Sequence, residues 1–323
     1  MMTLPDFEKK QIIYVFLVIG EKISFKNDNL IVTAVDGSIR LQVTCYRIYM
    51  LCIVGSFTIT TGLIQRSHKF GFPIFLLAAG FKVYDKLGAK MEGNVLLRKL
   101  QYKYSGLELA IAIINNKVIN QLSILENRRN KSEELILDIE KIKEKVKSLK
   151  SFDKSLPELL SIEGNIAKLY FKHQFDNVDW KGRKPRIKND FINSILDIGY
   201  SILFNFIETL LDIYGFDTYC GVLHKEFYMR KSLVCDLVEP FRVIIDFQVR
   251  KSINLGQFKE DDFNEVNGAY LLKWIANKKY ISILTGALLE RKSEIFLYIQ
   301  SYYRAFMKSK PSSEFPIFAW EKY

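Results

Sequence analysis

Residues 11–43, "QIIYVFLVIGEKISFKNDNLIVTAVDGSIRLQV", indicate how the fold begins. Short apolar or alternating runs are separated by "IGEK", "KNDN" and "VDGS", each of which suits a tight turn between strands. Residues 49–64, "YMLCIVGSFTITTGLI", are the most apolar stretch, but they are shorter than a membrane span and are rich in β-branched residues. This composition favours a buried strand followed by a helix.

The next residues complete a small β domain. Residues 59–71 predict a short helix, capped by Thr60 or Thr61 and stopped by Gly71. Residues 72–85, "FPIFLLAAGFKVYD", return to strand character. We therefore expect residues 1–92 to form a β-sandwich-like domain with one short helix.

From residue 93 the apolar residues take a helical spacing. The clearest helix is residues 131–150, "KSEELILDIEKIKEKVKSLK", which has one apolar stripe and a charged face with pairs such as Glu140–Lys143. Residues 175–189 read as a loop. Helical patterns continue through residues 162–173, 190–214, 239–251, 263–277 and 286–307. The predicted fold class is α+β multidomain, with an all-α domain over residues 93–323.

Composition and charge restrict the function. Apolar residues make up 49% of the 323 residues, enough to build a core, which argues against global disorder. The formal net charge of +11 favours an anionic partner, either nucleic acid or a membrane surface, although a basic protein without such a partner stays open. The four cysteines lack zinc spacing and read as buried thiols in a reducing compartment. The charged first ten residues do not resemble a signal peptide, so we expect a cytoplasmic protein.

Three acidic residues lie among apolar ones. Glu163 lies in "LLSIEGNIAKLYF", and Asp236 and Glu239 lie in "SLVCDLVEPFRVIIDF". The last two are three positions apart and would share one face of a helix. Because Pro240 is tolerated only in a first helical turn, we expect both carboxylates at the N-terminal end of that helix, where the dipole favours anions.

One of the three histidines, His224, follows an apolar approach in "GVLHKEFYMRKSLVCDLVEPFR" (221–242). A neutral imidazole with two or three carboxylates suits Mg²⁺ or Mn²⁺ better than a structural zinc. Neighbouring basic residues would hold a phosphate backbone: Lys225, Arg230, Lys231 and Arg242. The alternative is a buried histidine beside carboxylates that are paired with arginine. His68 reads as a surface residue near a helix end, and His173 as solvent-facing or capping a helix C-terminus.

The ordered motifs resemble a known family. "SIEGNIAKLYF", "W-x-G-R" at residues 180–183, "KNDFINSILDIGYSIL" and the segment 221–242 occur in the order found in the CRISPR adaptation integrase, the first-numbered CRISPR-associated protein. "GEKISFKNDNLIV", "GFPIFLL" and "GNVLLRKLQY" extend the resemblance to the amino terminus. "CYRIY" and "TTGLIQRSHKFGFPI" look most like members from type V systems.

The resemblance implies a prokaryotic, metal-dependent DNA integrase and endonuclease. Such an enzyme joins the 3′-hydroxyl ends of a prespacer to the CRISPR leader–repeat by transesterification. Carried over, Glu163, His224 and Glu239 would ligate one Mg²⁺ or Mn²⁺, with Asp236 supporting them. Family members form homodimers through the β domain, bind double-stranded DNA, and usually assemble with the small second-numbered adaptation protein.

Four further residues could contact DNA. Tyr170 and Trp180 could stack on splayed bases, and core aromatics are the alternative for both. Arg66 and Lys69 could follow the prespacer backbone.

A non-catalytic DNA-binding scaffold of an adaptation complex is the competing function. The mixed distribution of charge argues against a membrane-surface protein.

Overall fold

The computed structural model describes residues 2–88, 93–150, 155–175, 178–225 and 227–320. The chain divides into two compact units. One holds Met1–Gly93 with Trp274–Lys278, and the other holds Asn94–Lys273 with Lys279–Tyr323. The expected domain boundary, between residues 92 and 93, adjoins a segment (89–92) outside the described residues.

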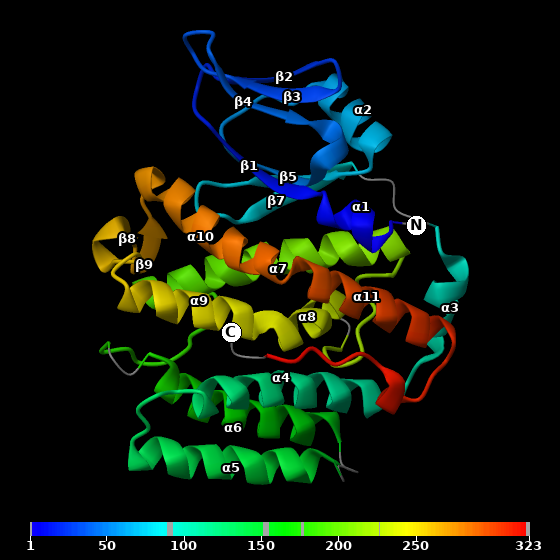
Figure 1. Cartoon of the computed structure of the whole chain (residues 1–323), viewed down its shortest axis with the longest axis vertical. Helices are drawn as coiled ribbons and strands as arrows, with labels where there is room; N and C mark the ends of the chain where they lie inside the picture. Colours follow the sequence, from blue (N-terminus) through cyan, green and yellow to red (C-terminus); the bar gives the residue numbers. More distant parts are fainter. Residues whose placement is uncertain (1, 89–92, 151–154, 176–177, 226, 321–323) are drawn as a thin grey trace. The chain divides into compact units, whose positions relative to one another are not determined.

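In the described residues of the first unit, two sheets are accompanied by the short helices α1 and α2 (Figure 1). One sheet has the order β1-β5-β6-β7, in which only β7 is antiparallel to its neighbour. The other is an antiparallel sheet of order β2-β3-β4. The elements are α1 Leu4–Glu8, β1 Gln11–Leu17, β2 Lys22–Lys26, β3 Asn29–Thr33, β4 Ile39–Thr44, β5 Ile48–Gly55, α2 Thr61–Phe70, β6 Pro73–Leu77 and β7 Val83–Gly88.

Both sheets and α2 contribute to one apolar core, so the β-sandwich-like expectation is confirmed. Val15 of β1, Val32 of β3, Ile53 of β5 and Leu63 of α2 are buried together. β5 lies between two parallel neighbours, which explains its continuous apolar run. α2 ends at Gly71 with φ +67°, as its sequence predicts.

The helix α1 was not expected. It is five residues long, with Pro5 in its first turn and Thr3 as its N-cap. A single turn is too short to show a helical period, so the sequence pattern could not reveal it.

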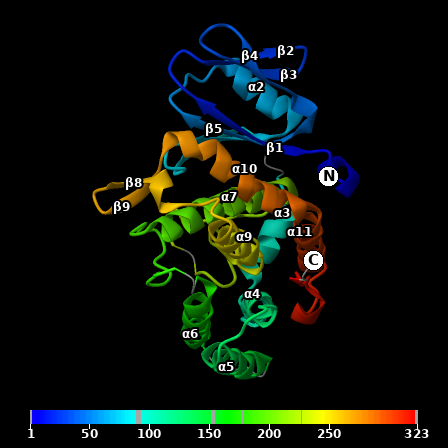
Figure 2. The same cartoon turned by 60° about the vertical axis from the view of Figure 1, so that its left-hand side comes forward.

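The second unit is largely helical. Figure 1 and Figure 2 show α4, α5 and α6 side by side, and the three helices contact one another pairwise. α7 is almost entirely buried. The elements are α3 Val95–Lys103, α4 Glu108–Glu126, α5 Glu133–Lys150, α6 Leu156–Gln174, α7 Phe191–Tyr214, α8 Ser232–Val238, the 3₁₀ turn η2 Glu239–Phe241, α9 Arg242–Asn254, β8 Phe263–Val266, β9 Ala269–Leu272, α10 Asn277–Glu290 and α11 Lys292–Met307.

The predicted helix over residues 263–277 is wrong. Strands β8 and β9 form an antiparallel hairpin there. Its two-residue turn is Asn267–Gly268, both with positive φ (52° and 74°), which matches the twist of a two-residue hairpin. The Asn-Gly pair therefore overrides the weak helical spacing.

The helix that carries the acidic residues is also interrupted. α8 ends at Val238, and Glu239 begins the turn η2 before α9. Pro240 has no N–H to continue the hydrogen-bond ladder, although Glu239 before it keeps the α conformation (φ −55°, ψ −47°). Asp236 therefore lies in the last turn of α8, and the expectation that both carboxylates share the N-terminal end of one helix is wrong.

The apolar stripe of α5 is present with one exception. Leu135, Ile139 and Leu149 are buried, whereas Ile136 is 48% exposed at the edge of the stripe. On the polar face, Lys143 Nζ lies 2.9 Å from Glu140 Oε1, as the spacing predicts.

Candidate active site

Two carboxylates from different elements converge on one ammonium group. Glu163 comes from the middle of α6 and Glu239 from the start of η2. Lys117 of α4 forms an ion pair with Glu163 Oε1, and its Nζ lies 2.7 Å from Glu239 Oε2. Arg242 Nη2 lies 2.9 Å from the other oxygen of Glu239. Both carboxylates can therefore reach a single cation.

The charges around Glu239 keep it ionised. Burial alone would raise the pKa of this carboxyl, but Arg242 and Lys117 outweigh burial and lower that pKa to about 2. Burial would likewise lower the pKa of Lys117, but Glu239 and Glu163 outweigh it and raise that pKa. The group is thus two carboxylates balanced by two cations.

Asparagines hold α4 against η2. The amide of Asn120 donates to the Pro240 carbonyl at 3.1 Å and to the Phe318 carbonyl at 3.0 Å. Asn116 exchanges two further hydrogen bonds with Phe318. These buried bonds fix the helix that carries Lys117 beside the turn that begins with Glu239.

His224 lies in the loop before α8 and is oriented by Asp236. The fully buried Asp236 carboxylate accepts the backbone N–H groups of Val222, Leu223 and His224 at 2.6, 3.0 and 2.9 Å. His224 Nδ1 lies 2.7 Å from Asp236 Oδ1. The backbone passes close to this carboxylate at Gly221, where a Cβ would lie 2.8 Å from Asp236 Oδ2.

This arrangement selects the tautomer of His224. A carboxylate that accepts several N–H bonds acts as an acceptor toward Nδ1, so Nδ1 carries the proton. Nε2 then presents a lone pair, and the side chain is 30% exposed. Metal-binding histidines commonly donate from their other ring nitrogen to a carboxylate in this way.

Arg242 is held by an aromatic ring. Its guanidinium lies 4.5 Å from the ring centroid of Tyr200, and that of Arg183 lies 5.2 Å from the same centroid. The hydroxyls of Tyr200 and Tyr170 donate to the buried Asp246. Burial raises the pKa of Asp246 to about 6, against the effect of these two bonds. This network fixes the side chain that contacts Glu239.

The residues fit a divalent cation in donor type. Two carboxylates that share one ammonium can share one metal ion, and hard oxygens with one imidazole suit Mg²⁺ or Mn²⁺. Within the described part of the chain, however, no group of three or more His, Cys, Asp and Glu side chains is assembled for a metal. Lys117 lies between the two carboxylates instead.

The basic residues near His224 differ in their contacts. Lys225 is exposed. Arg230 donates to the Lys225 carbonyl and lies over the ring of Phe227. Lys231 Nζ lies 2.8 Å from the buried Glu208. The alternative that arginine pairs with the carboxylates is present in part. Arg242 forms an ion pair with Glu239, whereas Asp236 is bonded to His224 and to backbone N–H groups.

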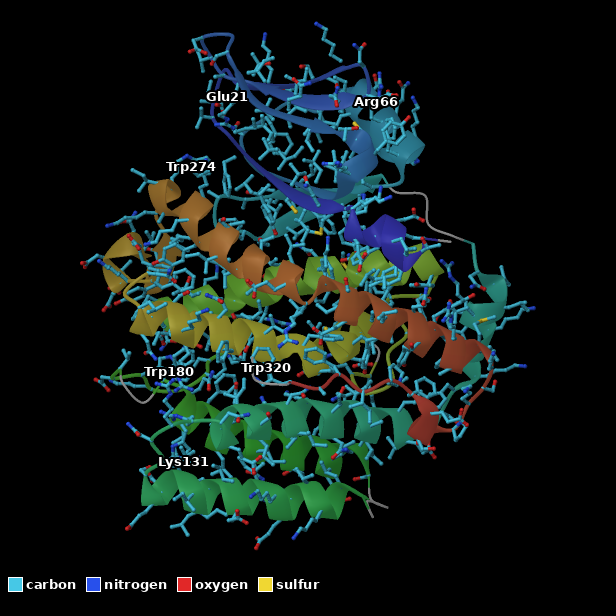
Figure 3. The ribbon with its side chains drawn as sticks, viewed as in Figure 1. Glu21, Arg66, Lys131, Trp180, Trp274 and Trp320 are labelled. Carbon is cyan, nitrogen blue, oxygen red and sulfur yellow. The ribbon has the colours of Figure 1, made fainter. Side chains whose placement is uncertain are left out.

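The two aromatic candidates are placed differently. Tyr170 is fully buried and its hydroxyl is bonded to Asp246, so it is a core aromatic. We therefore do not retain it as a base-stacking residue. Trp180, labelled in Figure 3, is partly exposed. Its ring packs edge-on against Phe175, and its Nε1 donates to Asp190 at 3.2 Å.

The candidates in the first unit are paired with an acidic residue. Arg66 of α2, labelled in Figure 3, and Lys69 both contact Asp28 in the turn between β2 and β3. Arg66 also lies over the ring of Phe25. The side chain of Lys69 stays 57% exposed.

The other two histidines, His68 and His173, differ in exposure. His68 is exposed in the last turn of α2, as expected. The expectation that His173 faces solvent or caps a helix is wrong, because it is 4% exposed and its Nε2 lies 2.9 Å from the buried Asp138. Asp138 belongs to α5, so this contact depends on helix packing.

Sequence reasoning missed Lys117. It is a single cation within the apolar segment 109–125 of α4. The signal that drew attention to Glu163, a charge among apolar residues, applies equally to this lysine.

Among the described residues, one helix is long and apolar enough to cross a membrane by length and composition. This is α7, and 83% of its most apolar window is buried inside the protein.

The sequence matches a family model. The model described as "CRISPR associated protein Cas1" matches residues 14–285. A CRISPR-associated endonuclease Cas1 from Thermodesulfovibrio yellowstonii is 29% identical over 76% of this chain and 80% of its own length. One from Thermus thermophilus is 30% identical over 78% of this chain and 76% of its own length.

Solved structures share the fold. A Cas1 protein from Thermotoga maritima superposes with a TM-score of 0.80 at 18% identity, over 97% of this chain and all of its own. A casposase bound to integration product gives 0.75 at 21% identity, over 97% and 96%. A Cas6-RT-Cas1–Cas2 complex gives 0.81 at 20% identity, over 97% of this chain and 36% of that longer chain.

Proposed function

This chain belongs to the Cas1 family, and we propose that it is a metal-dependent integrase that joins the 3′-hydroxyl ends of a prespacer DNA to a CRISPR repeat. Relatives are named CRISPR-associated endonucleases, and a fold neighbour was solved with an integration product. The fold and family support the reaction class, and the proposal adds the substrate and the metal.

The observation that carries the proposal is the convergence of Glu163 and Glu239 on one cation. The carboxylates come from α6 and η2, and both contact Lys117. His224 is the third proposed ligand, through Nε2, because Asp236 engages Nδ1. A bound Mg²⁺ or Mn²⁺ would polarise the scissile phosphate and stabilise the charge on the leaving oxygen.

The chain's own residues would position the reaction. Asp236 holds the imidazole, and Arg242 holds the Glu239 carboxylate. The exposed Lys225 is the best-placed cation of its loop to contact DNA phosphate. In the joining step the prespacer 3′-oxygen loses its proton and forms a bond to phosphorus. The phosphorus–oxygen bond of the repeat strand breaks, and the leaving oxygen takes a proton, so no nucleotide triphosphate is consumed.

The proposed partners are double-stranded prespacer and leader–repeat DNA, a second copy of this chain, and a Cas2 protein. Fold neighbours occur in complexes that contain Cas2, which supports the last of these. Arg230, Lys231, Arg242, Arg66, Lys69 and Trp180 remain proposed DNA contacts. A type V origin is likewise a proposal that rests on sequence segments of the first unit.

A non-catalytic DNA scaffold is the competing function. The two are separated by incubating the protein and its Cas2 partner with a fluorescent prespacer, a supercoiled repeat plasmid and Mn²⁺. We expect His224→Ala and Glu163→Ala to lose strand joining by at least about a hundredfold while retaining DNA binding. EDTA should abolish joining by the parent protein.

His68→Ala is the matched control, because it removes an exposed histidine from the other unit. It should join strands at the parental rate. If His224→Ala or Glu163→Ala also joins strands at that rate, the proposed site is wrong. If the parent binds DNA but never joins it, the scaffold function is correct.

A further inference from the structure

Lys117 is buried between the two proposed carboxylate ligands. Its side chain is 10% exposed, and its Nζ contacts both Glu163 and Glu239. The bonds of Asn116 and Asn120 fix the surrounding turns of α4. Moving a buried lysine away from two carboxylate partners is costly, because the lysine and the carboxylates are then left as buried charges without partners.

The group is already neutral without a metal. Glu163 and Glu239 carry two negative charges, and Lys117 and Arg242 carry two positive charges. A divalent ion that enters this group raises its charge to about +2, in a buried region where like charges repel strongly. The Lys117 ammonium also lies where a cation shared by the two carboxylates would bind.

We propose that Lys117 is the internal counter-ion of the metal site: its ammonium holds Glu163 and Glu239 together in the metal-free protein, and a divalent cation must displace it to bind. The proposal rests on the proposed function, because that function makes these carboxylates metal ligands. Lys117 is thus a positioning residue that sets how tightly the metal binds.

A coupling between metal and DNA follows. A phosphate beside the site supplies the negative charge that the metal-bound group lacks, and it offers the displaced ammonium a new partner. DNA therefore increases metal affinity, and by linkage the metal increases DNA affinity by the same factor. The protein then binds its metal weakly until DNA is present.

The test measures Mn²⁺ binding by the electron paramagnetic resonance of free Mn²⁺, with and without prespacer DNA at one ionic strength. Lys117→Met should bind Mn²⁺ about tenfold or more tighter than wild type without DNA, because one repelling charge is gone. DNA should increase the Mn²⁺ affinity of Lys117→Met by a smaller factor than it increases the Mn²⁺ affinity of wild type. Lys117→Arg, which keeps the charge, should retain weak binding.

Lys172→Met is the matched control. Lys172 also bridges two carboxylates, with Nζ 2.6 Å from Glu134 and 2.8 Å from Asp138, but it lies outside the site. The Mn²⁺ affinity of Lys172→Met should equal that of wild type. In EDTA, Lys117→Met should have a lower Tm than wild type, and Mn²⁺ should raise that Tm by more than it raises the wild-type value.

Several outcomes decide the proposal. If Lys117→Met binds Mn²⁺ no tighter than wild type, the counter-ion role is wrong. Glu239→Gln separates this failure from failure of the proposed function, because unchanged Mn²⁺ binding by Glu239→Gln means that the carboxylates are not metal ligands. If Lys117→Met does not fold, acylation of wild-type Lys117, read by mass spectrometry, decides. Labelling should rise when Mn²⁺ is added to saturation without DNA, because no phosphate then covers the displaced ammonium, and unchanged labelling would overturn displacement.

Discussion

At the scale of single residues, each proposed ligand depends on neighbouring side chains that set its orientation or its charge. His224 is useful as a ligand only because Asp236 engages its other ring nitrogen, and Glu239 stays ionised because Arg242 and Lys117 surround it. Each chemical group thus owes its state to a neighbour on another element.

Asp236→Asn tests this dependence. An amide presents one acceptor oxygen where the carboxylate presents two, so it cannot serve both the three backbone N–H groups and Nδ1. The imidazole then favours the tautomer with its proton on Nε2. We expect Mn²⁺ affinity in the presence of DNA to fall about 10- to 100-fold, measured by titration.

Asp217→Asn is the comparison, since Asp217 accepts the Tyr102 hydroxyl at 2.6 Å outside the site. It should leave Mn²⁺ affinity unchanged. Wild-type affinity in Asp236→Asn would mean that the His224–Asp236 contact does not orient a ligand.

At the scale of elements, two helices must approach closely. Gly199 of α7 faces Ile245 of α9, and a Cβ at Gly199 would lie only 2.4 Å from Ile245 Cγ2. α9 follows directly from η2, and Arg242 is its first residue. The missing side chain at Gly199 therefore allows the packing that places Arg242 against Tyr200.

Gly199→Ala should lower the free energy of unfolding by about 1–3 kcal/mol, because the overpacked interface must shift. Gly286→Ala is a matched change in α10, where a Cβ meets no atom within 4 Å. It should raise stability by about 0.4–1 kcal/mol through helix propensity. Thermal unfolding should therefore shift Tm in opposite directions. Equal shifts would contradict the proposed close approach.

At the scale of the whole molecule, the charge of +11 is distributed over folded surfaces of both units. Many of the cations are already paired, as Arg66 is with Asp28 and Lys231 with Glu208. Net charge therefore overstates the number of cations ready to meet phosphate, and the exposed ones should account for most of the salt dependence of DNA binding.

Lys225→Ala should reduce the slope of log K against log salt by about 1, the equivalent of one phosphate contact. Lys231→Ala should change the slope by less, because Lys231 is ion-paired with Glu208. Fluorescence anisotropy of a labelled prespacer at several salt concentrations gives both slopes. A larger change for Lys231→Ala would show that its pair opens on DNA.

The sequence by itself determined the order of the fold. Period-two runs with turn signals indicated the first unit, and the period of the 131–150 helix indicated the second, because these patterns are local. It failed where local signals competed, at the Asn267–Gly268 turn and at Pro240. The pattern of charges among apolar residues singled out Glu163, Asp236 and Glu239. The resemblance implied that Glu163, His224 and Glu239 are metal ligands, and those roles remain proposals.

Only the tertiary structure decided how these residues meet. Lys117 reaches Glu163 across 46 positions of sequence, and His173 meets Asp138 because α5 packs against α6. The pattern around Tyr170 left its ring open to either role, and packing buried it against Asp246. Contacts between distant segments depend on how helices pack, and a single sequence records periodicity but not those partners.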